Sequence, residues 1–246
     1  MLCNVSRQFV DKVVRQANPE EKTEERTLGS FRFLPHVAWS IDFFCLRINS
    51  VLFYAALLIE EASRKKLGAV VSREQKAQTA ISLVEMAKRR YGILPLVLKH
   101  DGGPQFKAGA FQDCLKEHRI ISLPSVFYYP RYNGRMERMV REVKGHLPQS
   151  FDRQDINTEI RMINSVPRRM LGGKTNDQAF WETIPQKDFE RDYFIREAQE
   201  IKQETGSALA WKGGDAKFQR IAVEEVLKKH QLCLFTKGKT LQIGSG

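Results

Sequence analysis

The stretch of sequence that decides the fold is LPLVLKHDGG, residues 94–103. Its first half, Leu94–Leu98, is a continuous apolar run of the kind that parallel sheets bury on both faces. An acid, Asp101, follows this run and precedes two glycines. Open α/β sheets present their ligand-binding groups at the carboxyl ends of parallel strands. The stretch therefore predicts a buried strand that delivers a carboxylate to a site.

The segments around this strand predict an α/β fold with a mixed five-stranded sheet flanked by helices. Short connections between the upstream strands favour antiparallel hairpins. The predicted strands are 36–46, 50–59, 67–72, 94–98 and 119–123. Periodicity of three to four residues predicts helices at 73–91, 106–117, 133–147, 152–164, 175–183 and 187–203.

A second acid, Asp42, lies inside the apolar strand 36–46. Side chains alternate along a strand, so Asp42 faces away from Trp39, Ile41 and their neighbours. An acid in a strand interior runs against strand propensity and needs either a solvated face or a function. Taken alone, a solvated strand residue is the more common case.

A third acid, Glu137, lies on the predicted helix 133–147, with 35 residues between it and Asp101. At about 100° per residue, Glu137 falls beside Arg141 and Lys144. The apolar arc of the helix contains Met136, Met139, Val140, Val143 and Leu147. Taken alone, Glu137 would be half of a surface ion pair with Arg141, and Asp101 would be a turn residue. Jointly, the three carboxylates predict a site for divalent metal.

Composition points to a polyanionic partner. The 246 residues contain 40 Lys and Arg against 29 Asp and Glu, a net charge of +11. Such a balance favours nucleic acid first and an acidic membrane surface second. No apolar run of about 18 residues and no signal peptide is visible, which predicts an intracellular, cytoplasmic protein, nucleoid-associated if bacterial, without membrane contact. Four scattered cysteines without a C-x-x-C pair predict reduced thiols and no structural zinc.

The chain is predicted to have three parts: residues 1–30, an N-terminal helix and polar linker; 31–185, a globular core; and 186–246, a helical C-terminal extension with a small tail.

Five segments, in this order, resemble the DDE superfamily of retroviral integrases and insertion-sequence transposases, whose cores have a ribonuclease-H-like fold. They are WSID (39–42), LIEEASRK (58–65), HDGGPQF (100–106), YPRYNGRMER (129–138) and NSVPRRMLGGKT (164–175). Together they cover about residues 31–185. The chain departs from the family where Gly102 replaces a common Asn, Gln105 a common Glu, and Glu60-Glu61 a frequent Asp-Asp. No helix-turn-helix or zinc-bearing module precedes the core.

The resemblance implies that Asp42, Asp101 and Glu137 are the catalytic triad and hold two Mg²⁺ (or Mn²⁺) ions, whose chemistry suits phosphodiester transfer. It implies double-stranded DNA, both element ends and target, as substrate, and a homo-oligomer. The residues expected to contact DNA are Arg131, Asn133, Arg135, Arg138, Arg141 and Lys144.

We therefore expect a DNA transposase or integrase, a polynucleotidyl transferase that performs metal-dependent end cleavage and strand transfer. Two alternatives stay open. One is a ribonuclease-H-like nuclease that cleaves without joining, and the other is a catalytically silent DNA-binding transposase remnant.

Overall fold

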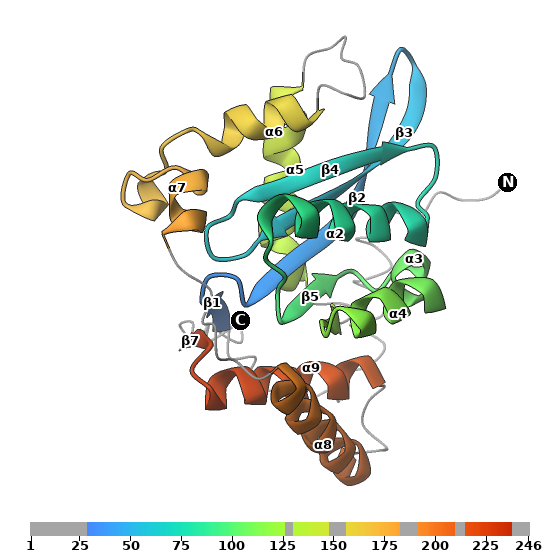
Figure 1. Ribbon diagram of the computed structural model, residues 1–246, viewed down its shortest axis with the longest axis vertical. Coiled ribbons are helices and arrows are strands. Elements are labelled where there is room, and N and C mark those ends of the chain that lie inside the picture. Colours follow the sequence, from blue (N-terminus) through green and yellow to red (C-terminus); the bar gives the residue numbers. More distant parts are fainter. Residues whose placement is uncertain (1–28, 126–129, 148–155, 183–190, 210–214, 238–246) are drawn as a thin grey trace, which may run out of the picture. The chain divides into compact units, whose positions relative to one another are not determined.

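A computed structural model describes residues 29–125, 130–147, 156–182, 191–209 and 215–237 (Figure 1). The N-terminal helix and linker predicted for residues 1–30 lie outside these ranges except for residues 29 and 30. Residues 32–234 form one compact unit, and residues 1–31 with 235–246 form another. The three-part division of the chain stays a prediction.

The larger unit is built on a five-stranded sheet with the strand order β4-β3-β2-β5-β6. Strands β2 (Ala38–Ile48), β3 (Val51–Glu60) and β4 (Lys66–Ser72) form an antiparallel meander. Strands β5 (Val97–His100) and β6 (Ile121–Pro124) run parallel to β2. The predicted mixed five-stranded sheet is confirmed.

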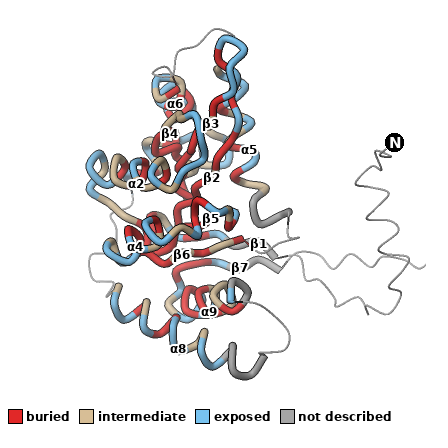
Figure 2. Tube along the Cα trace, turned by 90° about the vertical axis from the view of Figure 1, so that its right-hand side faces the viewer, coloured by how far each residue is buried: buried red, intermediate tan, exposed pale blue. Residues whose placement is uncertain are grey.

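Helices cover both faces of this sheet. On one face, Trp39, Ile41 and Phe43 of β2 pack in a core with α2 (Ala77–Tyr91), α3 (Pro104–Lys107), α4 (Gly109–Glu117) and α7 (Asn176–Trp181). On the other, Phe44 and Leu46 pack with α5 (Pro130–His146) and α6 (Ile156–Asn164). The alternation along β2 thus supplies two cores, and the buried residues follow the central strands (Figure 2).

Strand β5 begins later than the apolar run predicted. The backbone N–H groups of Leu96 and Val97 both donate to the carbonyl of Val37, and Pro95 has no N–H to give. The regular ladder with β2 therefore starts only at Val97, while Leu94 is partly buried against the first core. Asp101 follows the last residue of β5 directly, as predicted.

The chain closes with helical elements beyond the sheet. A 3₁₀ turn, Arg169–Leu171, precedes α7, and α8 (Arg191–Leu209) contacts α9 (Asp215–Lys229), which packs along β6. Arg191 fixes the start of α8 by donating to the carbonyls of Leu94 and Pro95, at 2.6 and 2.7 Å. A separate two-stranded sheet joins β1 (Gly29–Phe33) and β7 (Cys233–Lys237). In the described part of the chain, no helix has the length and apolar character to cross a membrane.

Two asparagines of α6 pair with the outer strand β4. Asn157 accepts from the N–H of Ala69 and donates to its carbonyl, both at 2.9 Å. Asn164 does the same for Lys66, at 3.1 and 2.8 Å. Seven helical residues rise about 10.5 Å and three strand residues about 10 Å, so the two amides match the two backbone sites.

We predict that Asn164→Ala destabilises the protein by about 1–3 kcal/mol, because it leaves the buried N–H and carbonyl of Lys66 without these partners. Urea unfolding measures the loss, and faster amide exchange at Lys66 locates it. Met162→Ala, on an exposed position of the same helix, is the control and should change stability by less than about 0.5 kcal/mol. Equal effects of the two substitutions would contradict the role given to Asn164.

Candidate active site and its supporting ion cluster

Three elements deliver the three predicted acids. Asp42 lies in the middle of β2, Asp101 follows β5, and Glu137 lies on α5. Strands β2 and β5 are parallel neighbours in which Ser40 is paired with Lys99. Asp42 and Asp101 each lie two residues beyond that pair, so they reach the same level of the sheet. Helix α5 packs against the face of β2 that carries Asp42.

The pKa of Asp42 reflects the proximity of the other two acids. Burial, and after it the negative charges of Asp101 and Glu137, raise the pKa of Asp42 from 3.8 to about 6, against the opposing hydrogen bond from the Phe43 N–H. Asp42 is partly buried, whereas Asp101 and Glu137 are exposed. Three carboxylates that repel one another fit a hard divalent cation, because its charge removes the repulsion.

Hydrogen bonds shape the loop that carries Asp101. The Asp101 carboxylate accepts from the N–H of Gly103 at 2.9 Å, and the Nδ1 of His100 accepts from the N–H of Gly102 at 3.0 Å. Burial, with a smaller effect of the Lys107 charge, lowers the pKa of His100 to about 4. His100 is therefore neutral at physiological pH, and its Nε2 donates to the Ser122 hydroxyl at 2.9 Å. Gly102 adopts a φ of +75°, which glycine and asparagine tolerate best, so the replacement of the family's common Asn keeps the turn.

Beneath the three acids lies a buried ion cluster centred on Glu61, which is 2% exposed. Its carboxylate accepts from the Lys99 Nζ at 2.8 Å, from the Ser40 hydroxyl and from the Arg135 guanidinium. Burial favours the neutral form of Glu61, but the charges of Lys99 and Arg135 and the hydrogen bonds outweigh it and lower the pKa to about 2. Glu61 is therefore ionised and paired in the folded protein.

Each partner of Glu61 lies two residues before one of the three acids. Ser40 and Asp42 both lie on β2, and Arg135 and Glu137 both lie on α5. Lys99 lies within β5, and Asp101 directly follows that strand. The Glu61 cluster thus ties together the three elements that carry the predicted triad. The neighbouring Glu60 has a different task, since it accepts from the N–H groups of His36, Ala62 and Ser63 and closes the turn between β3 and β4.

The predicted DNA-contacting residues lie along α5. Its apolar arc is buried as expected, with Met136, Met139 and Val143 in the second core. Arg138, Arg141 and Lys144 are exposed beside Glu137, and the Lys144 amine lies 5.4 Å from the centroid of the Phe44 ring. Arg135 is bound to Glu61. The side chains of Arg131 and Asn133 lie outside the described residues.

Comparison with known proteins identifies the core. Residues 34–130 match the family model of the integrase core domain. The chain is similar to an uncharacterized protein of Caenorhabditis elegans, at 28% identity over 124 residues, which is 48% of this chain but only 10% of that protein. The chain thus spans a small part of the length of that curated relative.

Solved structures share the fold. A chain of the simian T-cell lymphotropic virus intasome in complex with the PP2A regulatory subunit B56 gamma aligns with a TM-score of 0.58 and 18% identity, covering 75% of this chain and 69% of that chain. The HTLV-2 integrase catalytic core domain in complex with magnesium aligns with a TM-score of 0.52 and 19% identity, covering 61% and 99%. The resemblance to an integrase-type core, inferred from sequence, is confirmed.

We predict that Asp42→Asn stabilises the protein at neutral pH by about 1–3 kcal/mol, because it removes an acid whose pKa is raised by burial and repulsion. The unfolded chain releases this proton near pH 3.8 and the folded chain near pH 6, so wild-type stability falls as pH rises between these values. The gain from Asn should therefore vanish below about pH 3.8. Urea unfolding at several pH values tests this, with Asp113→Asn on the exposed side of α4 as control. A gain that is independent of pH would contradict the repulsion.

Glu61→Gln should destabilise the protein by about 3 kcal/mol, because it leaves the buried Lys99 ammonium without its counter-charge. The stabilisation by Glu61 is present above pH 4.5 and is lost as pH falls toward 2, so the difference from wild type should shrink in acid. Glu182→Gln, which breaks an exposed pair with Lys174, should cost less than about 1 kcal/mol. A comparable loss in both variants, measured by chemical denaturation, would refute the special role of the cluster.

Proposed function

We propose that this chain, whose residues 34–130 match the integrase core domain, is a DNA transposase or integrase. In this proposal it is a polynucleotidyl transferase that cleaves DNA at the end of an element and joins the freed 3′-hydroxyl to target DNA. The observation that carries the proposal is the raised pKa of Asp42, which Asp101 and Glu137 help to cause. Three acids that are far apart in the sequence would thus interact electrostatically within an integrase-type core.

The catalytic roles follow from the donor set. Asp42, Asp101 and Glu137 would hold two Mg²⁺ or Mn²⁺ ions, since carboxylate oxygens are the ligands these ions prefer. Two such ions activate an attacking oxygen and stabilise a leaving oxygen in an in-line displacement. Asp42 would fix the ions from the rigid centre of the sheet, whereas the exposed Asp101 and Glu137 would adjust to the DNA phosphate. The magnesium named for the HTLV-2 catalytic core supports this choice of ion.

Substrate binding would use the exposed side of α5. Arg138, Arg141 and Lys144 lie on the same helix as Glu137 and are open to solvent, so in this proposal they would contact phosphates beside the proposed metal ligands. The net charge of +11 favours double-stranded DNA as the polyanion. Arg135 would act on DNA only indirectly, by holding α5 on Glu61. Because two element ends must be joined to one target, we further propose a homo-oligomer.

We predict that the purified protein joins pre-cut DNA ends to a target plasmid in Mg²⁺ or Mn²⁺, and that Glu137→Gln lowers the rate by more than about 100-fold through loss of a metal ligand. A panel of candidate end sequences in a strand-transfer assay supplies the measurement, with Glu117→Gln, an exposed position on α4, as control. Cleavage without joining would favour a ribonuclease-H-like nuclease. Binding with neither reaction would favour a silent transposase remnant.

Charge reversal on α5 separates DNA binding from chemistry. The double variant Arg141→Glu, Lys144→Glu should weaken DNA binding at least about tenfold and lower its salt dependence, because two phosphate contacts are lost. Arg89→Glu, exposed on α2 across the sheet, should leave binding nearly unchanged. Fluorescence anisotropy at several salt concentrations measures both. Equal losses would show that only net charge matters.

A further inference from the structure

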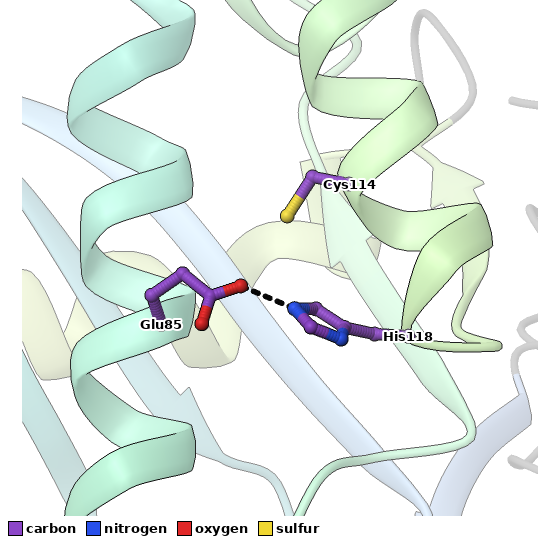
Figure 3. A group of neighbouring side chains, drawn as sticks. All are labelled: Glu85, Cys114 and His118. Atoms are coloured by element: carbon purple, nitrogen blue, oxygen red, sulfur yellow. Dashed lines mark hydrogen bonds and ion pairs between the residues drawn. The ribbon is translucent and has the colours of Figure 1, made fainter.

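A second group of metal-ligand side chains lies away from the three acids, between two helices. Glu85 projects from α2, while Cys114 and His118 lie one turn apart at the end of α4 (Figure 3). The carboxylate oxygen, the thiol sulfur and the imidazole nitrogen all lie within 4.8 Å of one another. Helices α2 and α4 contact each other over the first core, so the group is held by packed elements.

The donor set is that of a zinc site. Zinc is bound in proteins by thiolate, imidazole and carboxylate, often by three protein ligands with a fourth position for water. Thiolate and imidazole select zinc-class metals over magnesium, whereas the three acids offer oxygen alone. We propose that Glu85, Cys114 and His118 form a zinc-binding site that ties α2 to α4. This proposal does not rest on the proposed function.

The surroundings of these three side chains allow a zinc ion to enter, and they show which groups it must displace. Cys114 is 8% exposed, whereas the Glu85 side chain is 31% exposed and opens the group to solvent. His118 Nε2 is hydrogen-bonded to Glu85, and its Nδ1 lies 3.4 Å from the Lys88 Nζ. Zinc would replace the proton between His118 and Glu85, and the exposed Lys88 amine can turn away to solvent. Since burial raises the pKa of the Cys114 thiol, zinc binding must also release that proton and should strengthen as pH rises.

The spacing of Cys114 and His118 in the sequence is a signal for this site, although the chain has no C-x-x-C pair. Cys114 and His118 are four residues apart, which places them on one face of a helix. Glu85 comes from another helix, and its position depends on the packing of α2 against α4. The absence of a C-x-x-C pair therefore does not exclude a zinc site built from mixed ligands.

The test is a titration of the full chain, freed of metal with a chelator, with Co²⁺ and then Zn²⁺. We expect one equivalent of Co²⁺ to produce tetrahedral visible bands and a thiolate charge-transfer band, which Zn²⁺ abolishes and excess Mg²⁺ does not. The charge-transfer band should disappear in Cys114→Ser and persist in Cys45→Ser, whose cysteine is exposed on β2. His118→Gln, which leaves Cys114 in place, should lower Co²⁺ affinity more than about tenfold.

Thermal unfolding supplies a second readout. Zn²⁺ should raise the melting temperature of the wild type and of Cys45→Ser, because it binds the folded chain, but not that of His118→Gln. A charge-transfer band that survives in Cys114→Ser, or affinity unchanged in His118→Gln, would overturn the proposal. Because neither readout involves DNA, failure here and failure of strand transfer are distinguishable.

Discussion

The structure depends on the neutralisation of one buried carboxylate, Glu61. Taking such a charge out of water costs several kcal/mol unless cations and hydrogen bonds meet it in good geometry. Its partners Lys99 and Arg135 come from β5 and α5, so both elements must dock in one position for the folded state to be stable. The acids two residues further along are thereby fixed as well. The energetic demand of a residue outside the triad thus sets the geometry of the candidate active site.

Two acids of the sheet region have opposite pKa shifts because their environments differ. Glu61 and Asp42 both lie in the sheet region, yet the pKa of Glu61 falls to about 2 and that of Asp42 rises to about 6. Glu61 has its counter-charges within the protein, whereas Asp42 has two further acids nearby. The two pKa shifts are opposite because the protein supplies counter-charges to one acid and further negative charges to the other.

Local pattern was enough to predict the sheet and the helices that flank it, because periodicity is encoded within short windows. The start of β5 was misplaced, since Pro95 and the carbonyl of Val37 decide it through contacts across the sheet. The burial and pairing of Glu61 could not be predicted from local pattern. Its partners lie 38 and 74 residues away, and an acid at a strand end looks like a surface residue until the fold buries it.

The amides of α6 on β4 and the packing of α9 along β6 have a consequence for how copies of the chain can meet. An unpaired strand at the rim of a sheet is a template for another chain. Here Asn157 and Asn164 already occupy backbone groups of one rim, and α9 lines the other. Continuous intermolecular sheets through this core are therefore disfavoured. An assembly of several protomers would have to be built through helix and loop surfaces, which leaves the strands free to act as a rigid internal scaffold.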